Sequence, residues 1–255
     1  MTAIKVDAHL YIVGSGAMGL SDPADCHVYL LDGGERLALI DAGAGKDIAP
    51  ILANIQSCGY SLDKIGIIFL THAHLDHAGG CQKLKQTLEE NGAHVQLAAS
   101  AKEAQILANG TAEELGLNLM GHGEIDRDKF FPPFKVDLIL ADGESLRLGD
   151  LLFHMIETPG HNPGCMCYLV DFPGERRFLF PGDVIYMGGV ISLGNWIGSD
   201  LQEYRRNLKK LAGLNIDGLF PGHHLFTLRN GQSHIDKALE AFNGLFPPPN
   251  ISQLP

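Results

Sequence analysis

The sequence predicts an α/β fold in which two sheets pack together and helices lie outside them. Each half of the chain reads as strands, then a helix, then a further strand, a pattern typical of layered α/β domains. The run "KIGIIFLT" is continuously apolar, as expected for a strand buried on both faces. A chain of 255 residues can bury one substantial core. We therefore expect a single domain over residues 1–255.

The first half should begin with strands and hairpins and then alternate helices with strands. Turn residues Asp32, Gly33 and Gly34 predict a hairpin between two of the strands. Residues 100–133 carry several glycines and predict a surface insertion or lid with helical parts. The other expected elements are strands at 4–13, 27–31, 37–41, 64–71 and 94–100, a helix at 47–57, and a loop leading into a helix within 72–90.

The second half repeats this arrangement with shorter strands. Turns at "DGES" and "FPGE" separate neighbouring strands. The expected strands lie at 136–140, 146–148, 152–157, 165–170, 178–180 and 218–220, and the expected helices at 201–211 and 233–245.

Composition and charge exclude several classes of partner. The net charge of −11 disfavours nucleic acid and anionic membrane surfaces, which bind proteins through neutralised phosphates. The chain has no apolar stretch long enough to cross a bilayer, and its first residues form a poor signal peptide. Five cysteines, an odd number, indicate reduced thiols. We expect a cytoplasmic protein with a small-molecule substrate, and a homodimer is an open alternative.

The stretch "YIVGSGAMGL" contains a glycine pattern, Gly14-x-Gly16-x-x-Gly19, that resembles a dinucleotide-binding turn. That turn requires a helix immediately afterwards, because the pyrophosphate sits on the helix N-terminus. Here Pro23 follows, and then the strand-like "HVYLL". The pattern therefore predicts a flexible loop, which we expect to form one wall over the substrate.

The histidines indicate where the chemistry lies. "THAHLDH" places His72, His74, Asp76 and His77 within six residues at the end of the buried strand. Imidazole and carboxylate groups packed this densely are costly in a folded loop unless a cation organises them. The spacing therefore predicts a metal site.

Three further stretches expose a metal-ligand side chain after a predicted strand. "ETPGHNPG" presents His161, "LFPGDVIY" presents Asp183 and "LFPGHHLF" presents His223. In each, Pro-Gly predicts a sharp turn that projects the next side chain from the end of the strand. His224 is the neighbouring alternative to His223, and we favour His223 because it follows Pro-Gly directly.

Taken in order, these residues resemble the ligand series of the metallo-β-lactamase-fold hydrolases, HxHxDH followed by His, Asp and His. The resemblance implies a four-layer αβ/βα sandwich with the metals at one edge. It also matches Asp41, in "LIDAG", to an aspartate that orients a ligand histidine. By this resemblance one metal is held by His72, His74 and His161, the second by Asp76, His77 and His223, and both by Asp183.

Imidazole and carboxylate ligands suit two divalent ions, Zn²⁺ first and iron or manganese as alternatives. Two such ions would share a water and lower its pKa, and the resulting hydroxide would attack a carbonyl carbon. Asp76 would accept and relay a proton. No serine or cysteine nucleophile is required.

The resemblance also narrows the substrate to a thioester, lactone or ester. "LTHAHLDHAGG" and "TPGHNPG" are similar to the glyoxalase II-like branch of thioesterases. Tyr186 follows Asp183 at the spacing found in the lactonase-like branch, where a tyrosine hydroxyl bonds the substrate carbonyl. Two alternatives stay open: a β-lactamase-like amide hydrolase, and a persulfide dioxygenase-like enzyme with one iron held by His72, His161 and Asp183.

Overall fold

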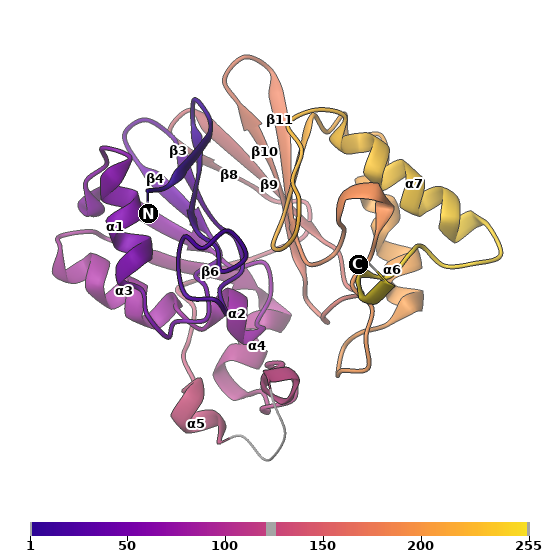
Figure 1. Ribbon diagram of the computed structural model, residues 1–255, viewed down its shortest axis with the longest axis horizontal. Coiled ribbons are helices and arrows are strands. Elements are labelled where there is room, and N and C mark those ends of the chain that lie inside the picture. The colour runs from indigo at the N-terminus through magenta and orange to yellow at the C-terminus, as the bar shows by residue number, and fades with distance from the viewer. Residues whose placement is uncertain (1, 121–125, 254–255) are drawn as a thin grey trace. The chain divides into compact units, whose positions relative to one another are not determined.

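The computed structural model describes residues 2–120 and 126–253 (Figure 1). Its contacts divide the chain into two compact units, each built on one sheet. The first unit comprises Met1–Leu140 with Leu148–Asp150, and the second comprises Ala141–Arg147 with Leu151–Pro255. That the whole chain forms one domain stays a prediction.

The first unit contains a seven-stranded mixed sheet in the order β1-β2-β3-β4-β5-β6-β7. Strands β1 to β4 pair antiparallel, whereas β4, β5, β6 and β7 pair parallel. The predicted hairpin at Asp32, Gly33 and Gly34 is confirmed, because it joins the antiparallel strands β3 and β4. The strands are β1 (Ile4–Asp7), β2 (Leu10–Gly14), β3 (Val28–Asp32), β4 (Leu37–Ile40), β5 (Ile65–Phe69), β6 (Gln96–Ser100) and β7 (Leu138–Leu140).

The helices of the first unit pack on this sheet, with α1 against β2 and both α3 and α4 against β6 (Figure 1). The amphipathic face of α3 buries Cys81, Leu84 and Leu88 in the same core as Ile51 and Ile55 of α1. The helical segments are α1 (Ala49–Ser57), η1 (Leu62–Lys64), α2 (Leu75–Ala78), α3 (Cys81–Glu90), α4 (Ala101–Asn109), η2 (Leu117–Met120) and α5 (Arg127–Phe130).

The second unit contains a five-stranded mixed sheet in the order β12-β11-β10-β9-β8. Strand β10 pairs antiparallel with β9 and β11, and β11 pairs parallel with β12. The strands are β8 (Ser145–Leu148), β9 (Leu151–Glu157), β10 (Met166–Phe172), β11 (Arg176–Gly182) and β12 (Gly218–Pro221).

Helix α7 (Gly231–Asn243) packs against β12 and buries Ile235, Ala238 and Phe242. The remaining helical segments of this unit are η3 (Met187–Gly189), α6 (Leu201–Asn207), η4 (Leu208–Leu211) and η5 (Ile251–Gln253). In the part of the chain that the structure describes, no helix combines the length and the hydropathy needed to cross a bilayer.

Some sequence expectations need correction. Residues 4–13 form two antiparallel strands, β1 and β2, because a turn at Ala8 and His9 reverses the chain. The expected helix at 201–211 changes from α-helix to 3₁₀ geometry at Leu208. The expected helix at 233–245 begins earlier, at Gly231, and ends at Asn243.

The glycine pattern after β2 forms a loop, as its context predicts, and the flexibility of this loop stays a prediction. The next element along the chain is strand β3, so residues 14–19 do not open a helix. The loop is instead tied together by hydrogen bonds, with the Leu20 N–H donating to the Ser15 carbonyl and the Gly16 N–H to the Asp25 carbonyl. Its role as a wall over the substrate stays a prediction.

The expected insertion at residues 100–133 contains α4, η2 and α5, and residues 121–125 of it lie outside the described residues. Leu115 and Leu117 are fully buried in the core of the first unit. The segment therefore contributes packed side chains as well as surface.

The burial of β5 yields a stability prediction. Ile68 lies in the middle of β5 and is 0% exposed, whereas Ile139, on β7, is 51% exposed. Ile68→Ala should lower the free energy of unfolding by about 2–5 kcal/mol, because it leaves a cavity in a packed core. Ile139→Ala should lower it by less than about 1 kcal/mol. Urea unfolding measures both, and equal losses would contradict the assignment of β5 to the core.

Candidate metal centre

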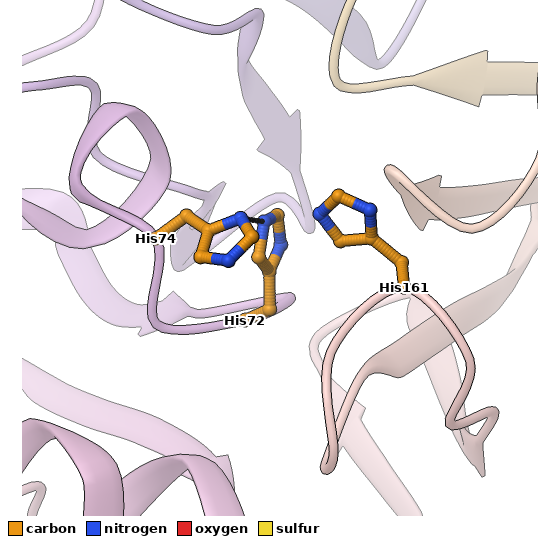
Figure 2. A group of neighbouring side chains, drawn as sticks. All are labelled: His72, His74 and His161. Atoms are coloured by element: carbon orange, nitrogen blue, oxygen red, sulfur yellow. Dashed lines mark hydrogen bonds between the residues drawn. The ribbon is translucent and has the colours of Figure 1, made fainter. Parts of the chain in front are cut away.

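Two of the predicted ligands, His72 and His74, lie side by side in the loop that joins β5 to α2. Figure 2 shows both rings and the contact between them, in which Nε2 of His72 lies 3.1 Å from Nδ1 of His74. The rings are nearly perpendicular, with an interplanar angle of 76°. Both side chains are buried. The loop thus directs two imidazole nitrogens at one point, which fits a shared cation.

The next histidine along the chain, His77 in helix α2, is held by Asp41. Its Nδ1 donates to Oδ2 of Asp41 at 2.8 Å, and both side chains are buried. A carboxylate accepts only, so the proton resides on Nδ1 and the Nε2 lone pair remains for a cation. This contact is the one expected from the resemblance for Asp41.

Strand direction explains why Asp41 meets this loop. Strands β4 and β5 are parallel neighbours, so the residues after Ile40 and after Phe69 emerge at the same edge of the sheet. Asp41 adopts a φ of 63°, a left-handed conformation that Asp and Asn tolerate better than most residues. Its Oδ1 accepts the backbone N–H of Thr71 at 2.8 Å.

Asp76 lies in the first turn of α2 and is the most exposed of the four ligand candidates in this unit. Its side chain is 38% exposed, and its Oδ2 lies 3.7 Å from Nε2 of His77. The Cys26 N–H donates to the Asp76 carbonyl at 3.2 Å. Asp76 therefore combines a fixed backbone with a carboxylate that solvent can reach.

In the second unit, Asp183 and His223 lie together. They follow β11 and β12, which are parallel neighbours, so both emerge at the same sheet edge. The Gly222 N–H donates to the Gly182 carbonyl at 2.9 Å and fixes the two turns to each other. Nε2 of His223 lies 3.6 Å from Oδ2 of Asp183.

His161 joins this group from the loop between β9 and β10, where Figure 2 shows its ring. Its Nε2 lies 3.9 Å from Oδ2 of Asp183, and its Nδ1 donates to the carbonyl of Ser192 at 3.0 Å. The backbone carbonyl thereby fixes the tautomer and leaves the Nε2 lone pair available for a cation.

Two aromatic residues hold this loop in place. Trp196 donates its Nε1–H to the His161 carbonyl at 2.9 Å, and Tyr204 donates its hydroxyl to the Ser192 carbonyl at 2.9 Å. A Cβ at Gly160 would lie 2.5 Å from the Tyr204 ring, so glycine is required for this close approach. The Pro-Gly turn before His161 therefore packs against Tyr204 as well as reversing the chain.

The adjacent residues His223 and His224 have different neighbours, and this difference shows which of the two suits a metal. The His224 ring lies edge-on to Tyr186, with centroids 5.7 Å apart, and His224 has a φ of 60°. His223, by contrast, faces Asp183. The geometry favours His223 as the ligand. Tyr186 is 1% exposed, and its contact with a substrate carbonyl stays a prediction.

The donor set of each unit fits a divalent cation. In the first unit, ligand atoms of Cys26, Asp41 and His77 also lie within 4.8 Å of one another. Burial raises the pKa of the Cys26 thiol to about 12, so the thiol is neutral near pH 7. Imidazole nitrogens and carboxylate oxygens remain, the donors that Zn²⁺, iron and manganese accept.

Sequence reasoning missed three groups that support the ligands. Thr71 Oγ1 donates to Asp41 and lies 3.1 Å from Nδ1 of His72. Glu103, which is fully buried, accepts the Ala73 N–H at 2.8 Å. The third is the Ser192 carbonyl. Of these groups, only Glu103 could have been found from the sequence. It ends a capping-box pattern, Ser-x-x-Glu, that begins at Ser100, the N-cap residue of α4.

Comparisons with known proteins identify the family of the chain. The model of the metallo-beta-lactamase superfamily matches residues 21–223. The chain is 28% identical over 215 residues to acyl-coenzyme A thioesterase MBLAC2 of Gallus gallus, covering 77% of this chain and 72% of that protein. It is 29% identical over 220 residues to the Homo sapiens protein of the same name, with the same coverage.

Solved structures share the fold. BJP-1, a subclass B3 metallo-β-lactamase of Bradyrhizobium japonicum, matches with a TM-score of 0.69 and 25% identity over 95% of this chain and 92% of that chain. FEZ-1 from Legionella gormanii matches with a TM-score of 0.70 and 20% identity over 95% and 94% of the two chains. The predicted α/β fold, with two mixed sheets and their helices, is thus confirmed.

The Asp41–His77 contact yields a prediction about metal affinity. Asp41→Asn keeps the shape and the left-handed backbone, but it removes the negative charge that supports the His77 ring. The affinity for Zn²⁺ should fall about 10- to 100-fold. Competition with a chromophoric chelator measures the dissociation constant without any assay of activity.

Asp171→Asn provides a matched control. Asp171 also binds a histidine at 2.8 Å, but that partner, His154, is not a candidate ligand. The control should keep the Zn²⁺ affinity of the unchanged protein. An unaltered dissociation constant in Asp41→Asn would refute the orienting role of Asp41.

Proposed function

Because the chain belongs to the metallo-β-lactamase superfamily and is a metal-dependent hydrolase, we propose that it hydrolyses thioesters of coenzyme A. The observation that carries this proposal is the similarity to acyl-coenzyme A thioesterase MBLAC2, at 28–29% identity over 77% of the chain. The donor groups of both units support a metal-dependent hydrolase, since they offer the nitrogen and oxygen ligands that divalent metal ions accept.

We assign the metal ligands as the resemblance implies, with two divalent ions, Zn²⁺ first. Each unit supplies a group of donors whose ligand atoms face one another, which supports this assignment. In the first unit these residues are His72, His74, Asp76 and His77, and in the second they are His161, Asp183 and His223.

When bound, the ions polarise the substrate carbonyl and lower the pKa of a water molecule. The chain's own residues prepare for this role by fixing which nitrogen of each ring is free. The Asp41 carboxylate holds the proton of His77 on Nδ1, and the Ser192 carbonyl holds that of His161 on Nδ1. Pre-set tautomers avoid reorganisation when the ligands are needed.

Hydrolysis also requires a proton to leave the attacking water and another to reach the departing sulfur. Asp76 suits this transfer, because its carboxylate is 38% exposed while its neighbours in the loop are buried. We propose that an oxygen of Asp76 accepts the proton and passes it to the leaving thiolate. Tyr186 is the candidate donor of a hydrogen bond to the substrate carbonyl.

Substitution of His74 tests this function. With an acyl-coenzyme A thioester as substrate, His74→Ala should lower kcat/KM about 10²-fold or more, because it removes a metal ligand worth several kcal/mol to the transition state. The metal content per chain should fall as well. His154→Ala, which changes a histidine on β9 bound to Ser145 and Asp171, is the matched control and should keep both values.

A panel of substrates discriminates the remaining possibilities. Thioesters, lactones, aryl esters and a β-lactam are offered together with elemental analysis of the purified protein. Turnover of lactones or β-lactams in place of thioesters would overturn the proposed substrate class. One iron per chain with oxygen uptake would support the dioxygenase-like alternative instead.

A further inference from the structure

We propose that a cavity of the first unit binds the phosphate-bearing nucleotide end of coenzyme A. The cavity has a volume of about 460 Å³ and lies between the loop after β4, the start of α2, and α5. This inference rests on the proposed function, because it identifies which part of that substrate the cavity would hold. The side chains that line it and carry the argument are Lys46, Lys83, Lys129, Leu75, Leu117 and Phe130.

The three lysines make this cavity positive in a chain that is otherwise strongly acidic. The net charge of the protein is −11, yet the described residues that line the cavity include no aspartate or glutamate. Lys46 has one acidic neighbour, Asp22, at 4.0 Å, and its side chain remains 57% exposed. Such a local concentration of ammonium groups attracts polyanions.

Two of the ammonium groups have defined positions. Lys83 donates to the backbone carbonyl of Gly45, which leaves its charge uncompensated by any carboxylate at that contact. The Nζ atom of Lys129 lies 5.7 Å from the centroid of the Phe130 ring. These contacts hold positive charge at the cavity wall, where a phosphate can pair with it.

The remaining lining side chains are apolar. Phe130 is 60% exposed, which is high for a phenylalanine, whereas Phe131 is 3% exposed and packs into the core. Of the nearby phenylalanines Phe130, Phe131 and Phe134, Phe130 is therefore the one that lines the cavity. An exposed aromatic ring next to lysines suits a ligand that carries an aromatic base and phosphates.

The cavity adjoins the metal-ligand loop. Leu75 lies between His74 and Asp76 in the chain, and its N–H donates to the Leu115 carbonyl at 3.1 Å. A Cβ at Gly116 would lie 3.0 Å from the His74 ring, so only glycine lets this segment approach so closely. The segment that leads into Leu117, a lining residue, thus contacts the loop at His74 and Leu75.

Coenzyme A has the chemistry that this cavity would recognise. Its nucleotide end carries an adenine and three phosphates, and a flexible arm separates them from the reacting sulfur. A site for the nucleotide end is therefore expected beside the metal-ligand loop, which carries His72 and His74, instead of within it. Lysines would pair with the phosphates, and Phe130 would stack on the base or cover it.

Binding of adenosine 3′,5′-bisphosphate to the purified protein tests the inference without any catalysis. The triple variant Lys46→Gln, Lys83→Gln and Lys129→Gln should raise its dissociation constant about tenfold or more, because each exposed charge pair contributes up to about a fivefold effect. The control triple variant changes exposed lysines of the same unit that do not line the cavity: Lys64→Gln, Lys102→Gln and Lys135→Gln. It makes the same change in net charge and should bind like the unchanged protein.

Equal weakening in both triple variants would show that only net charge matters and would overturn the inference. Absence of measurable binding to the unchanged protein would overturn it as well. Circular dichroism of each variant establishes that the fold is kept, and all six lysines are exposed, so folding should tolerate their replacement.

Phe130→Ala tests the apolar wall. The dissociation constant for adenosine 3′,5′-bisphosphate should rise about fivefold or more, the low end of the range for a base stacked on an aromatic ring. Phe246→Ala is the matched control, since Phe246 is 80% exposed and belongs to the second unit. Identical constants for these two variants would remove Phe130 from the site.

Turnover separates failure of this inference from failure of the proposed function. We compare kcat/KM for an acyl-coenzyme A thioester with kcat/KM for the same acyl group on N-acetylcysteamine, which lacks the nucleotide. The ratio should fall about tenfold in the cavity triple variant and stay constant in the control triple variant. If the unchanged protein cleaves neither thioester, the proposed function fails, and the bisphosphate titration still decides the cavity. If it cleaves both and the ratio is the same in all variants, the function stands and the cavity assignment falls.

Discussion

The hydrogen bond between Asp41 and His77 is the contact on which the metal-ligand loop of the first unit depends. Both side chains are buried, and a buried carboxylate is costly unless its oxygens accept hydrogen bonds. Asp41 meets this requirement through the Thr71 N–H, the Thr71 hydroxyl and the His77 ring. The same bonds fix the start of the loop at Thr71 and the tautomer of His77 in α2. These hydrogen bonds offset the cost of burying the Asp41 charge, and they also order the groups that would bind a cation.

The second unit reaches a similar result with neutral groups. There the Ser192 carbonyl orients His161, and Tyr204 and Trp196 hold the two segments that carry these residues. His161 follows β9, which pairs antiparallel with β10. Asp183 and His223 follow the parallel strands β11 and β12, and Asp41 and His72 come after the parallel strands β4 and β5. Parallel pairing is therefore what gathers residues that are distant in the sequence.

The structure shows where positive charge lies in a chain whose net charge is negative. A net charge of −11 argues against polyanionic partners in general. Three basic side chains, those of Lys46, Lys83 and Lys129, nevertheless line one cavity beside α2. Overall charge describes how the protein repels or attracts at long range, whereas recognition of a phosphorylated ligand is decided by groups within hydrogen-bond distance. An acidic enzyme can accordingly hold an anionic substrate at one place.

By itself, the sequence determined the fold class, the hairpin at Asp32, the apolar strand β5 and the seven candidate ligands, because apolar periodicity, turn residues and ligand spacing are local properties. The preference for His223 over its neighbour also followed from a local Pro-Gly turn. Asp41 was expected from the resemblance, but only the tertiary structure revealed the other groups that support the candidate ligands. Thr71 directly precedes His72, whereas Glu103 and the Ser192 carbonyl come from segments distant in the sequence from the residues they contact, and a backbone carbonyl has no signature in the sequence. Packing likewise decided that Phe130 lines the cavity while Phe131 and Phe134 lie at the core. Nearby residues of the same type look alike in the sequence, and only the folded backbone sets the direction of each side chain.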